Sequence, residues 1–276
     1  MTERLSRGGA FAQKYGPWAL VTGASRGLGA EFARQLAERG LNLVLAARSG
    51  SQLERLAADL ARAYGITARA AVVDLSRADL LNALRPVTDS LEVGLLVNNA
   101  GLSTVGPFLA QDADYLLGQL HTNARAALVL TRHYGSLMAA RGRGGVIFLA
   151  SGSALHGTPW SAHYCGTKAY NLMLAEALWA EWRPLGVDVL GFMAGLTRTP
   201  GVEANHLKPS RLVPLGSPER AVRRALKALG RAPSASDGLR NHLGYAALGL
   251  MPRSLATRVL GRSMRVMFGS RVGSRE

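Results

Sequence analysis

The stretch Trp18-Ala-Leu-Val-Thr-Gly-Ala-Ser-Arg-Gly-Leu-Gly29 joins a short apolar run to a glycine-rich turn. Residues 28–39, which follow, have the spacing of an amphipathic helix, and Gly40 ends it. In this context glycines let the backbone approach a pyrophosphate at the amino end of the helix. The spacing Thr-Gly-x-x-x-Gly-x-Gly therefore predicts a dinucleotide site, although a tight strand-to-helix turn alone uses glycines in the same way.

Short apolar runs alternate with longer amphipathic stretches along the rest of the chain. This order is typical of β-α-β units and predicts an α/β fold, a Rossmann-type doubly wound parallel sheet flanked by helices. The further strands are expected at residues 42–47, 67–73, 93–97, 146–150 and 187–192, and the further helices at residues 51–64, 113–140 and 161–183. Beyond Gly195 the pattern weakens, and we expect a helix at 218–229, a Pro/Ser-rich turn at 232–238 and a terminal helix at 252–268.

The length of 276 residues is within reach of a single α/β domain with appendages. We expect an N-terminal surface arm at residues 1–16 and one Rossmann-fold domain at 17–249, which includes a substrate-loop region at 195–215. A basic helical extension is expected at 250–276. No stretch has both the length and the apolarity of a membrane-spanning helix, so we expect a soluble or peripheral protein.

Lysine and arginine number 33 against 18 aspartate and glutamate, a formal net charge of +15. Such a charge suits nucleic acid, an anionic membrane surface or anionic ligands, but the scatter of the basic residues favours a solvated surface. No aromatic-rich RNA motif or recognition-helix pattern appears, so no nucleic-acid partner is expected. The single cysteine, Cys165, cannot form an intramolecular disulfide, and no Cys/His cluster suggests a metal. A reducing cytoplasm fits this composition.

The end of the second expected strand indicates which dinucleotide is bound. NAD sites usually place an acidic residue there to bond the ribose 2′-hydroxyl, whereas NADP sites place an arginine nearby. This chain has Ala46-Ala47-Arg48, and Arg26 lies inside the glycine turn. Two guanidinium groups would suit a 2′-phosphate, so the sequence favours NADP(H) over NAD(H). Two ordinary surface arginines are the alternative interpretation.

Polar residues also follow the third and fourth expected strands. Asp74 would accept a hydrogen bond from the adenine amino group, or would serve only as a turn residue. In Asn98-Asn-Ala-Gly101 the amides would tie strands together while the small residues let the cofactor pass, and plain loop structure is the alternative.

The segment Tyr164-Cys-Gly-Thr-Lys168 places a phenol and an ammonium on one face of a helix, because positions i and i+4 are neighbours. A nearby ammonium favours the ionised phenol, so tyrosine becomes a competent acid or base near neutral pH. Ser151 ends the fifth expected strand, where open parallel sheets place groups that contact ligands. Its hydroxyl would hydrogen-bond the substrate oxygen.

With these motifs in order, the chain resembles a short-chain dehydrogenase/reductase over residues 17–199. The resemblance implies hydride transfer between a nicotinamide and a carbonyl or alcohol carbon. Tyr164 would be the general acid/base, Lys168 would lower its pKa and hold the nicotinamide ribose, and Ser151 would polarise the carbonyl. The thirteen-residue separation from the tyrosine selects Ser151 over Ser153. Asn123 matches the asparagine that completes the family's tetrad through a water and the lysine.

The resemblance also implies a set of cofactor contacts and one departure. The family commonly has Pro-Gly after the sixth strand, whereas this chain has Ala194-Gly-Leu-Thr-Arg-Thr199, so this loop would be less rigid. The residues expected to contact the cofactor are Gly23, Ser25, Arg26, Gly27, Leu28, Gly29, Arg48, Asp74, Leu75, Asn99, Ala100, Gly101, Tyr164, Lys168, Gly195, Leu196, Thr197 and Thr199.

Substrate and partners are suggested by less specific features. Tyr15-Gly-Pro-Trp18, the run at residues 41–49 and the C-terminal extension resemble the branch with 17β-hydroxysteroid dehydrogenases and long-chain 3-oxoacyl reductases, which implies an apolar lipid, steroid or 3-oxoacyl ketone. A homo-oligomer, dimer or tetramer, is expected. A non-catalytic nicotinamide-binding scaffold of the same fold is the alternative, and the complete Ser/Tyr/Lys set argues against it.

The last helix interleaves arginines with large apolar residues. This composition suits an anionic membrane surface, a cover over the substrate pocket, a partner subunit, or packing on its own domain. The arginines expected on one broad polar side are Arg253, Arg258, Arg262 and Arg265.

Overall fold

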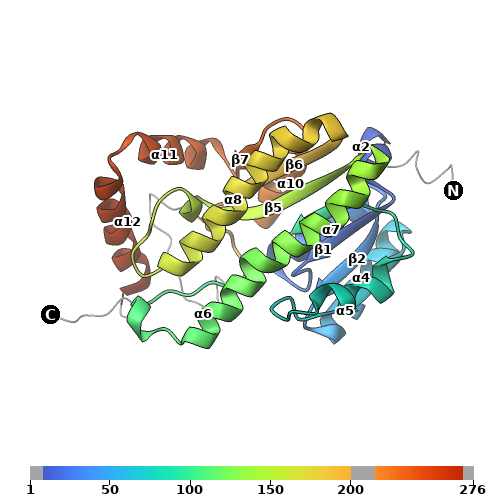
Figure 1. Cartoon of the computed structure of the whole chain (residues 1–276), viewed down its shortest axis with the longest axis horizontal. Coiled ribbons are helices and arrows are strands. Elements are labelled where there is room, and N and C mark those ends of the chain that lie inside the picture. Colours follow the sequence, from blue (N-terminus) through green and yellow to red (C-terminus); the bar gives the residue numbers. More distant parts are fainter. Residues whose placement is uncertain (1–8, 200–214, 270–276) are drawn as a thin grey trace.

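The computed structural model describes residues 9–199 and 215–269 and shows a seven-stranded sheet of parallel strands. The strand order is β3-β2-β1-β4-β5-β6-β7, so the sheet winds outward in both directions from β1 and β4 (Figure 1). The predicted doubly wound α/β fold is confirmed. The strands are β1 (Trp18–Thr22), β2 (Asn42–Ala47), β3 (Ala68–Val72), β4 (Val93–Asn98), β5 (Gly144–Ser151), β6 (Val187–Ala194) and β7 (Ser234–Ser236).

Helices cover both faces of the sheet and bury two apolar cores. One core lies under α2, α3, α4 and α10, and the other lies under α5, α7 and α8. The α-helices are α2 (Gly9–Tyr15), α3 (Gly27–Glu38), α4 (Gly50–Tyr64), α5 (Leu80–Thr88), α6 (Ala113–Leu120), α7 (Ala126–Arg141), α8 (Ala162–Trp182), α10 (Pro218–Ala228), α11 (Leu239–Leu250) and α12 (Arg253–Phe268). Short turns of helix are η1 (Phe108–Ala110), η2 (His121–Arg125), η3 (Gly152–Ala154) and η4 (Arg183–Leu185).

The central strands are largely apolar because helices cover them on both sides. All six residues of β4 are buried. Strands β5 and β6 pair over eight residues, from Gly144 with Val187 to Ser151 with Ala194. The carboxyl ends of β1, β4, β5 and β6 therefore form one edge of the sheet, on which the expected site residues lie.

Four elements differ from the expectations. The segment 232–238, expected as a turn, contains the edge strand β7, whose Ser-Ala-Ser sequence carries no apolar strand pattern. Helices α5 and α11 were not expected, and the expected helix at 113–140 contains the five-residue π-helical turn η2 between α6 and α7. Most of the expected substrate-loop region 195–215 lies outside the described residues.

Residues 9–15, placed by the sequence in a surface arm, form α2, which packs across the amino ends of β4 and β5. Ala12 and Tyr15 are buried, and the Tyr15 hydroxyl donates a hydrogen bond of 2.5 Å to the Asp188 carboxylate. Lys14 pairs with the same carboxylate. The segment before β1 is therefore partly built into the core.

The terminal helix α12 packs on the loop that leads into α8. Ala256 and Met264 are buried, and a side chain at Gly261 would meet the ring of Pro159 at 3.1 Å. The Arg265 guanidinium lies over the Trp160 ring, 5.1 Å from its centre. Figure 1 shows α12 beside the amino end of α8. In the part of the chain that the structure describes, no helix has the length and apolarity needed to cross a membrane.

Candidate active site

The glycine turn packs tightly against the carboxyl end of β4. Gly23 and Gly27 have positive φ angles of +64° and +60°, which side chains disfavour. A Cβ at Gly29 would lie 2.2 Å from the Gly23 carbonyl oxygen and 2.5 Å from the Asn99 amide nitrogen. Helix α3 begins here without a side-chain cap, so its first N–H groups are available to an anion. The turn fits a pyrophosphate.

Thr22 and Asn99 connect β1 to β4 at this edge. The Thr22 hydroxyl donates to the Val97 carbonyl and accepts from the backbone N–H groups of Asn99 and Ala100. The Asn99 side-chain amide donates to the Thr22 carbonyl at 2.8 Å and to the Gly23 carbonyl at 3.2 Å. These bonds hold the Asn98-Asn-Ala-Gly101 segment beside the glycine turn.

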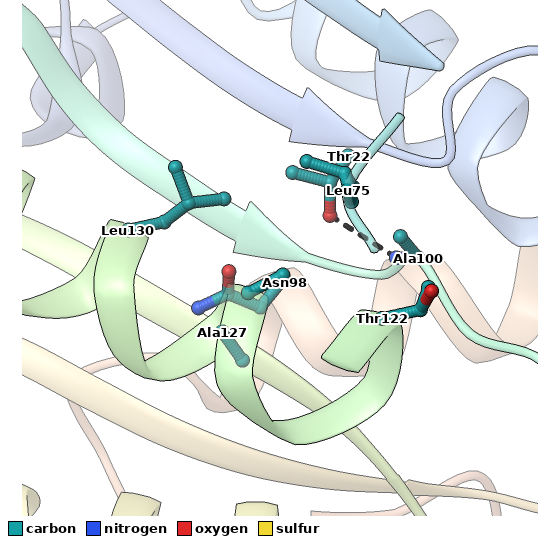
Figure 2. A pocket seen from close by; sticks show the side chains of 8 residues that line it. Thr22, Leu75, Asn98, Ala100, Thr122, Ala127 and Leu130 are labelled. Atoms are coloured by element: carbon teal, nitrogen blue, oxygen red, sulfur yellow. Dashed lines mark hydrogen bonds between the residues drawn. The ribbon is translucent and has the colours of Figure 1, made fainter. Parts of the chain in front are cut away.

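Asn98 points to the other side of the strand. Its amide nitrogen donates to the Thr131 hydroxyl of α7 at 2.9 Å, and its buried side-chain oxygen has no partner among the described residues. This side chain borders a cavity of about 10 Å³, shown in Figure 2, which suits a single water molecule. The cavity is lined by Thr22, Leu75, Asn98, Ala100, Thr122, Ala126, Ala127 and Leu130. It is too small for a cofactor, and the Leu75 side chain is among the groups that line it.

Arg26 and Arg48 lie exposed at the ends of the adjacent strands β1 and β2. Arg26 is the residue before α3, and Arg48 directly follows β2. One oxygen of the Asp74 carboxylate accepts hydrogen bonds from the backbone and the hydroxyl of Ser76, so this residue stabilises its own turn. These bonds, with the nearby charge of Arg48, hold the pKa of Asp74 below its usual value.

Ser151, Tyr164 and Lys168 converge where β5 ends and α8 begins. The Lys168 ammonium is buried, lies 5.8 Å from the centre of the Tyr164 ring and donates to the Leu149 carbonyl at 2.6 Å. The Ser151 hydroxyl lies 3.2 Å from that of Ser153. Both serines thus lie at the end of β5, and it is Ser151 whose hydroxyl contacts Tyr164.

Burial dominates the ionisation of this cluster. It raises the pKa of Tyr164 to about 12, while the hydrogen bond with Ser151 acts in the opposite direction. Burial likewise lowers the pKa of Lys168 to about 8. At neutral pH the pair is therefore a phenol beside an ammonium that gives up its proton unusually easily.

Asn123 holds the loop after β4 to α8 instead of pointing to solvent. Its side-chain oxygen accepts from the Leu102 N–H at 2.7 Å, and its amide donates to the Leu102 carbonyl and the Thr167 hydroxyl. Its backbone carbonyl, in the π-helical turn η2, accepts from the Asn171 amide at 2.8 Å. A Cβ at Gly101 would lie 3.3 Å from the Lys168 ammonium. Asn123 and Lys168 are therefore neighbours without a direct bond.

The segment after β6 returns to the glycine turn. The Thr197 hydroxyl donates to the Gly195 carbonyl, and Leu196 and Arg198 pair with the backbone of Gly216. A side chain at Gly27 would meet the Thr199 methyl group at 3.1 Å. Gly195, Leu196, Thr197 and Thr199 thus lie on the same edge as the turn.

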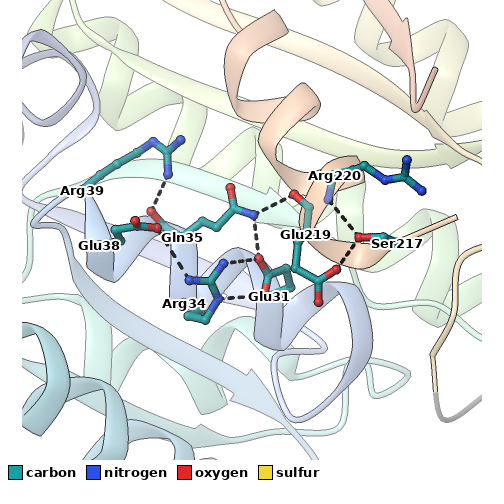
Figure 3. Close-up of polar contacts among 8 residues, drawn as sticks. All are labelled: Glu31, Arg34, Gln35, Glu38, Arg39, Ser217, Glu219 and Arg220. Atoms are coloured by element: carbon teal, nitrogen blue, oxygen red, sulfur yellow. Dashed lines mark hydrogen bonds and ion pairs between the residues drawn. The ribbon is translucent and has the colours of Figure 1, made fainter. Parts of the chain in front are cut away.

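Helix α10 holds this segment in place by packing on α3. The Gln35 amide donates to the Glu219 carbonyl at 2.9 Å and to the Glu31 carboxylate at 2.6 Å (Figure 3). Ser217 caps α10 by accepting from the Arg220 N–H. The segment after β6 is therefore tied, through Gly216 and α10, to the helix that follows the glycine turn.

Three residues at the site were not expected from the sequence. Thr167, just before Lys168 in the sequence, and Asn171, just after it, both hydrogen-bond to Asn123. Their positions on the helix of the Tyr-x-x-x-Lys motif could have indicated that they lie near the site. Tyr245 of α11 lies against Gly152, and nothing in its local sequence indicates this. Among residues 9–199 and 215–269, no three His, Cys, Asp or Glu side chains are grouped as metal ligands.

Comparisons with known proteins match this architecture. The signature of the short chain dehydrogenase family covers residues 17–209. The very-long-chain 3-oxoacyl-CoA reductase of Phaeosphaeria nodorum is 35% identical over 242 residues, which cover 86% of this chain and 70% of that protein. A structure of a 7beta-hydroxysteroid dehydrogenase superposes with a TM-score of 0.84 at 27% identity, covering 91% of this chain and 98% of the other.

A short-chain dehydrogenase from Sphingobium yanoikuyae, solved in complex with NADPH, superposes with a TM-score of 0.75 at 28% identity and covers 94% of this chain and 100% of its own. The family signature spans well over half of the chain and includes both the glycine turn and the Ser/Tyr/Lys cluster. The chain therefore belongs to the short-chain dehydrogenase family and is an oxidoreductase that interconverts a ketone and a secondary alcohol with a nicotinamide cofactor.

Proposed function

We propose that the protein is an NADP(H)-dependent oxidoreductase for an apolar ketone or its alcohol, with Tyr164 as the acid/base group. The observation that carries this proposal is the convergence of Ser151, Tyr164 and Lys168 at the carboxyl end of β5, on the edge where the glycine turn fits a pyrophosphate. Ligands of open α/β sheets bind at this edge.

Each member of the cluster has a separate task. A bound nicotinamide coenzyme supplies the hydride to the carbonyl carbon. The Tyr164 hydroxyl gives its proton to the carbonyl oxygen, and the Ser151 hydroxyl donates a hydrogen bond to the same oxygen. The Lys168 ammonium, 5.8 Å from the centre of the Tyr164 ring, stabilises the phenolate left on Tyr164. In the oxidation direction the phenolate removes the proton of the alcohol.

Asn123 acts as a positioning residue in this proposal. It joins the loop at Leu102 to α8 at Thr167, on the helix that carries Tyr164 and Lys168. The cofactor would be held by the glycine turn, the segment from Asn99 to Gly101, Lys168 and the loop after β6. Gly23 and Gly29 let the turn lie close against Asn99 and Ala100, where a Cβ would meet neighbouring atoms.

The enzymatic proposal is tested by nicotinamide absorbance with a panel of ketones and alcohols. Tyr164→Phe removes the exchangeable proton, so we expect turnover to fall about 100-fold or more while NADPH binding persists. Tyr170→Phe, at an exposed position of the same helix, is the matched control and should retain turnover. If Tyr164→Phe turned over substrate at the wild-type rate, Tyr164 would not be the acid/base group.

NADP(H) preference is proposed from the two exposed arginines at the ends of β1 and β2. No acidic residue ends β2, and Arg26 and Arg48 present planar donors suited to a 2′-phosphate. The similar short-chain dehydrogenase from Sphingobium yanoikuyae was solved with NADPH. Arg48→Asp should weaken NADPH more than NADH, whereas Arg55→Asp, exposed on α4, should change neither. An unchanged NADPH/NADH ratio in Arg48→Asp would reject this assignment.

An apolar substrate is proposed because similar proteins are named for such substrates, a 3-oxoacyl-CoA in one case and a hydroxysteroid in the other. In this chain, a packed apolar cluster that includes Ala154, Leu172 and Met193, with the ring of Tyr245 against it, lies beside the end of β5. A preference for short polar ketones over long-chain and steroid ketones would contradict this proposal.

We also propose that the protein is cytoplasmic and makes peripheral contact with anionic membranes through α12. Arg253, Arg258, Arg262 and Arg265 are exposed on this helix, and Leu255 and Val266 are 47% and 68% exposed. Arginine interleaved with exposed apolar side chains suits the interface of an anionic bilayer.

Sedimentation with phosphatidylserine vesicles tests the membrane contact, with phosphatidylcholine vesicles as the neutral comparison. The double variant Arg258→Glu/Arg262→Glu should bind the anionic vesicles at least about tenfold more weakly. The matched pair Arg55→Glu/Arg62→Glu on α4 should bind as the wild type does. Equal binding to both lipids, insensitive to salt, would reject the membrane contact.

A homo-oligomer is proposed from the outer faces of α7 and α8. Leu128 and Leu137 on α7 and Tyr170 and Met173 on α8 are 39–54% exposed, a set of large apolar side chains on two neighbouring helices. A second copy of the chain would bury them. Sedimentation should show a dimer or tetramer for the wild type and monomers for Tyr170→Glu/Met173→Glu. Leu109→Glu, at a 97% exposed position in η1, is the control. A monomeric wild type would reject the proposal.

A further inference from the structure

Tyr245 of α11 lies directly on the backbone at the end of β5. A Cβ at Gly152 would be 2.3 Å from both Cζ and Oη of Tyr245, so the ring occupies the space above this glycine. Gly152 follows Ser151, which ends the strand. The ring also packs on a small buried cluster that includes Ala150, Ala154, Leu172 and Met193. A residue of the C-terminal region therefore reaches the position next to the carbonyl-binding hydroxyl.

Tyr245 is the large side chain that α11 turns toward the sheet. Leu239, Leu243 and Leu250 of the same helix are 72%, 59% and 89% exposed. With three of its four leucines turned outward and Leu248 half-buried, α11 buries little of the usual apolar stripe. The inward position of Tyr245 is thus the principal contact of α11 with the end of β5.

Both ends of the α11–α12 segment are attached to the domain, so the ring has a defined position. At the start of α11, Asn241 donates to the Asp237 carboxylate, and Arg224 of α10 donates to the Asp237 carbonyl. Beyond α11, α12 packs on Pro159 and Trp160, as described above. The loop containing these two residues joins η3 to α8, so it connects Gly152 with Tyr164.

The hydroxyl of Tyr245 lies in the surroundings of the catalytic groups. Burial raises the pKa of Tyr245 to about 12, and the negative charge of Asp237 and of ionised Tyr164 adds to this. At neutral pH the group is therefore a neutral phenol that presents an aromatic face and one hydrogen-bond donor.

We propose that Tyr245 determines substrate specificity by forming the wall of the pocket over Gly152, which limits the group that a ketone carries on that side of its carbonyl. This inference rests on the proposed function. With the carbonyl oxygen at Ser151 and Tyr164, one substituent of the ketone points toward Gly152 and meets the tyrosine ring. A ketone whose carbonyl carbon carries a narrow group on that side, such as a methyl or an unbranched methylene, fits this arrangement, and one with an aromatic ring directly on that side does not.

The test compares reduction of acetophenone, which has one small substituent, with that of benzophenone, which has two large ones. Tyr245→Ala should raise the benzophenone/acetophenone ratio of kcat/KM by about tenfold or more, because space opens on one side of the carbonyl. Tyr245→Phe keeps the ring and should keep the ratio within about twofold. Leu243→Ala, exposed on the same helix, is the matched control. If Tyr245→Ala does not fold, Tyr245→Leu takes its place as the variant that removes the aromatic ring.

An unchanged benzophenone/acetophenone ratio in Tyr245→Ala, with or without an equal loss of activity toward both ketones, would overturn the proposal. Calorimetric binding of the two ketones to the NADP⁺-loaded chain repeats the comparison without turnover. A wild type that binds the ketones but reduces neither rejects the proposed function alone, since the ratio of the two binding constants still reports on the wall. Tighter benzophenone binding by Tyr245→Ala than by the wild type would support it.

Discussion

The ammonium of Lys168 lies 5.8 Å from the centre of the Tyr164 ring, one turn further along α8. The same nitrogen donates to the Leu149 carbonyl, two residues before Ser151. Burial pushes the two pKa values apart, because it raises that of Tyr164 to about 12 and lowers that of Lys168 to about 8. Between about pH 7 and 9, therefore, the charge of Lys168 changes while Tyr164 keeps its proton.

The pH dependence of alcohol oxidation should move when this charge is removed. Oxidation needs the Tyr164 phenolate, which a neighbouring ammonium favours. In Lys168→Met we expect the rising limb of the oxidation rate to shift to higher pH, together with a lower plateau.

Ketone reduction by the wild type should also depend on this charge. The reduction rate should fall as pH rises through about 8, where Lys168 loses its proton. Initial rates across pH, with the exposed Lys227→Met as control, check both statements; unshifted oxidation in Lys168→Met would contradict them.

The glycine turn should tolerate no side chain at Gly29. An added Cβ would lie 2.2 Å from the Gly23 carbonyl oxygen, which is backbone and cannot move aside. We expect Gly29→Ala to lose about 1–3 kcal/mol of unfolding free energy and to weaken NADPH binding. Gly118→Ala in α6, where nothing lies within 4 Å, should instead gain about 0.5–1 kcal/mol. Denaturant unfolding with and without NADPH measures both, and wild-type behaviour of Gly29→Ala would contradict the packing described for the turn.

The sequence predicted most of the sheet because its strands are continuous apolar runs between glycines. The expected bounds of β1 and β2 coincide with the structure, and β5 and β6 are longer than expected by one to two residues at an end. Strand β7 was missed since its Ser234-Ala-Ser236 sequence has no apolar pattern and pairs only at the sheet edge. Its identity as a strand depends on pairing with β6, which local sequence does not encode.

Sequence motifs predicted the residues at the centre of the candidate site. The Tyr164/Lys168 pair follows from helical spacing and Ser151 from the end of a strand. The contacts of Asn123 were not predictable, because the π-helical turn at 121–125 and the bonds to Leu102 and Asn171 depend on tertiary packing. Tyr245 was missed for the same reason, since its place over Gly152 depends on how α11 folds back onto β5.

Asn123 should matter for stability as well as for rate. Asn123→Ala leaves the N–H and carbonyl of Leu102 without their side-chain partner, at a cost of about 1–3 kcal/mol. We expect a lower unfolding midpoint and a lower kcat, because the loop and α8 are no longer joined. Asn82→Ala, exposed on α5, should change neither. Should Asn123→Ala unfold at the wild-type denaturant concentration, the hydrogen bonds to Leu102 would contribute nothing measurable.

The alkaline stability of the fold should depend on Tyr15. Burial, followed by the hydrogen bond and the charge of Asp188, raises the pKa of Tyr15 far above its ordinary value. The unfolded chain therefore loses this proton above about pH 10 while the folded chain keeps it, so its contribution to stability is complete below that pH and falls as pH rises.

Tyr15→Phe tests this linkage by urea unfolding near neutral pH and above about pH 10. Loss of the bond to Asp188 should cost about 1 kcal/mol at neutral pH. The decline of stability with rising pH should then be shallower in Tyr15→Phe than in the wild type, because the variant has no phenol to ionise on unfolding. The other buried tyrosines contribute equally to both proteins, and the exposed Tyr115→Phe is the control. Parallel declines in Tyr15→Phe and the wild type would mean that Tyr15 is not the group linking unfolding to alkaline pH.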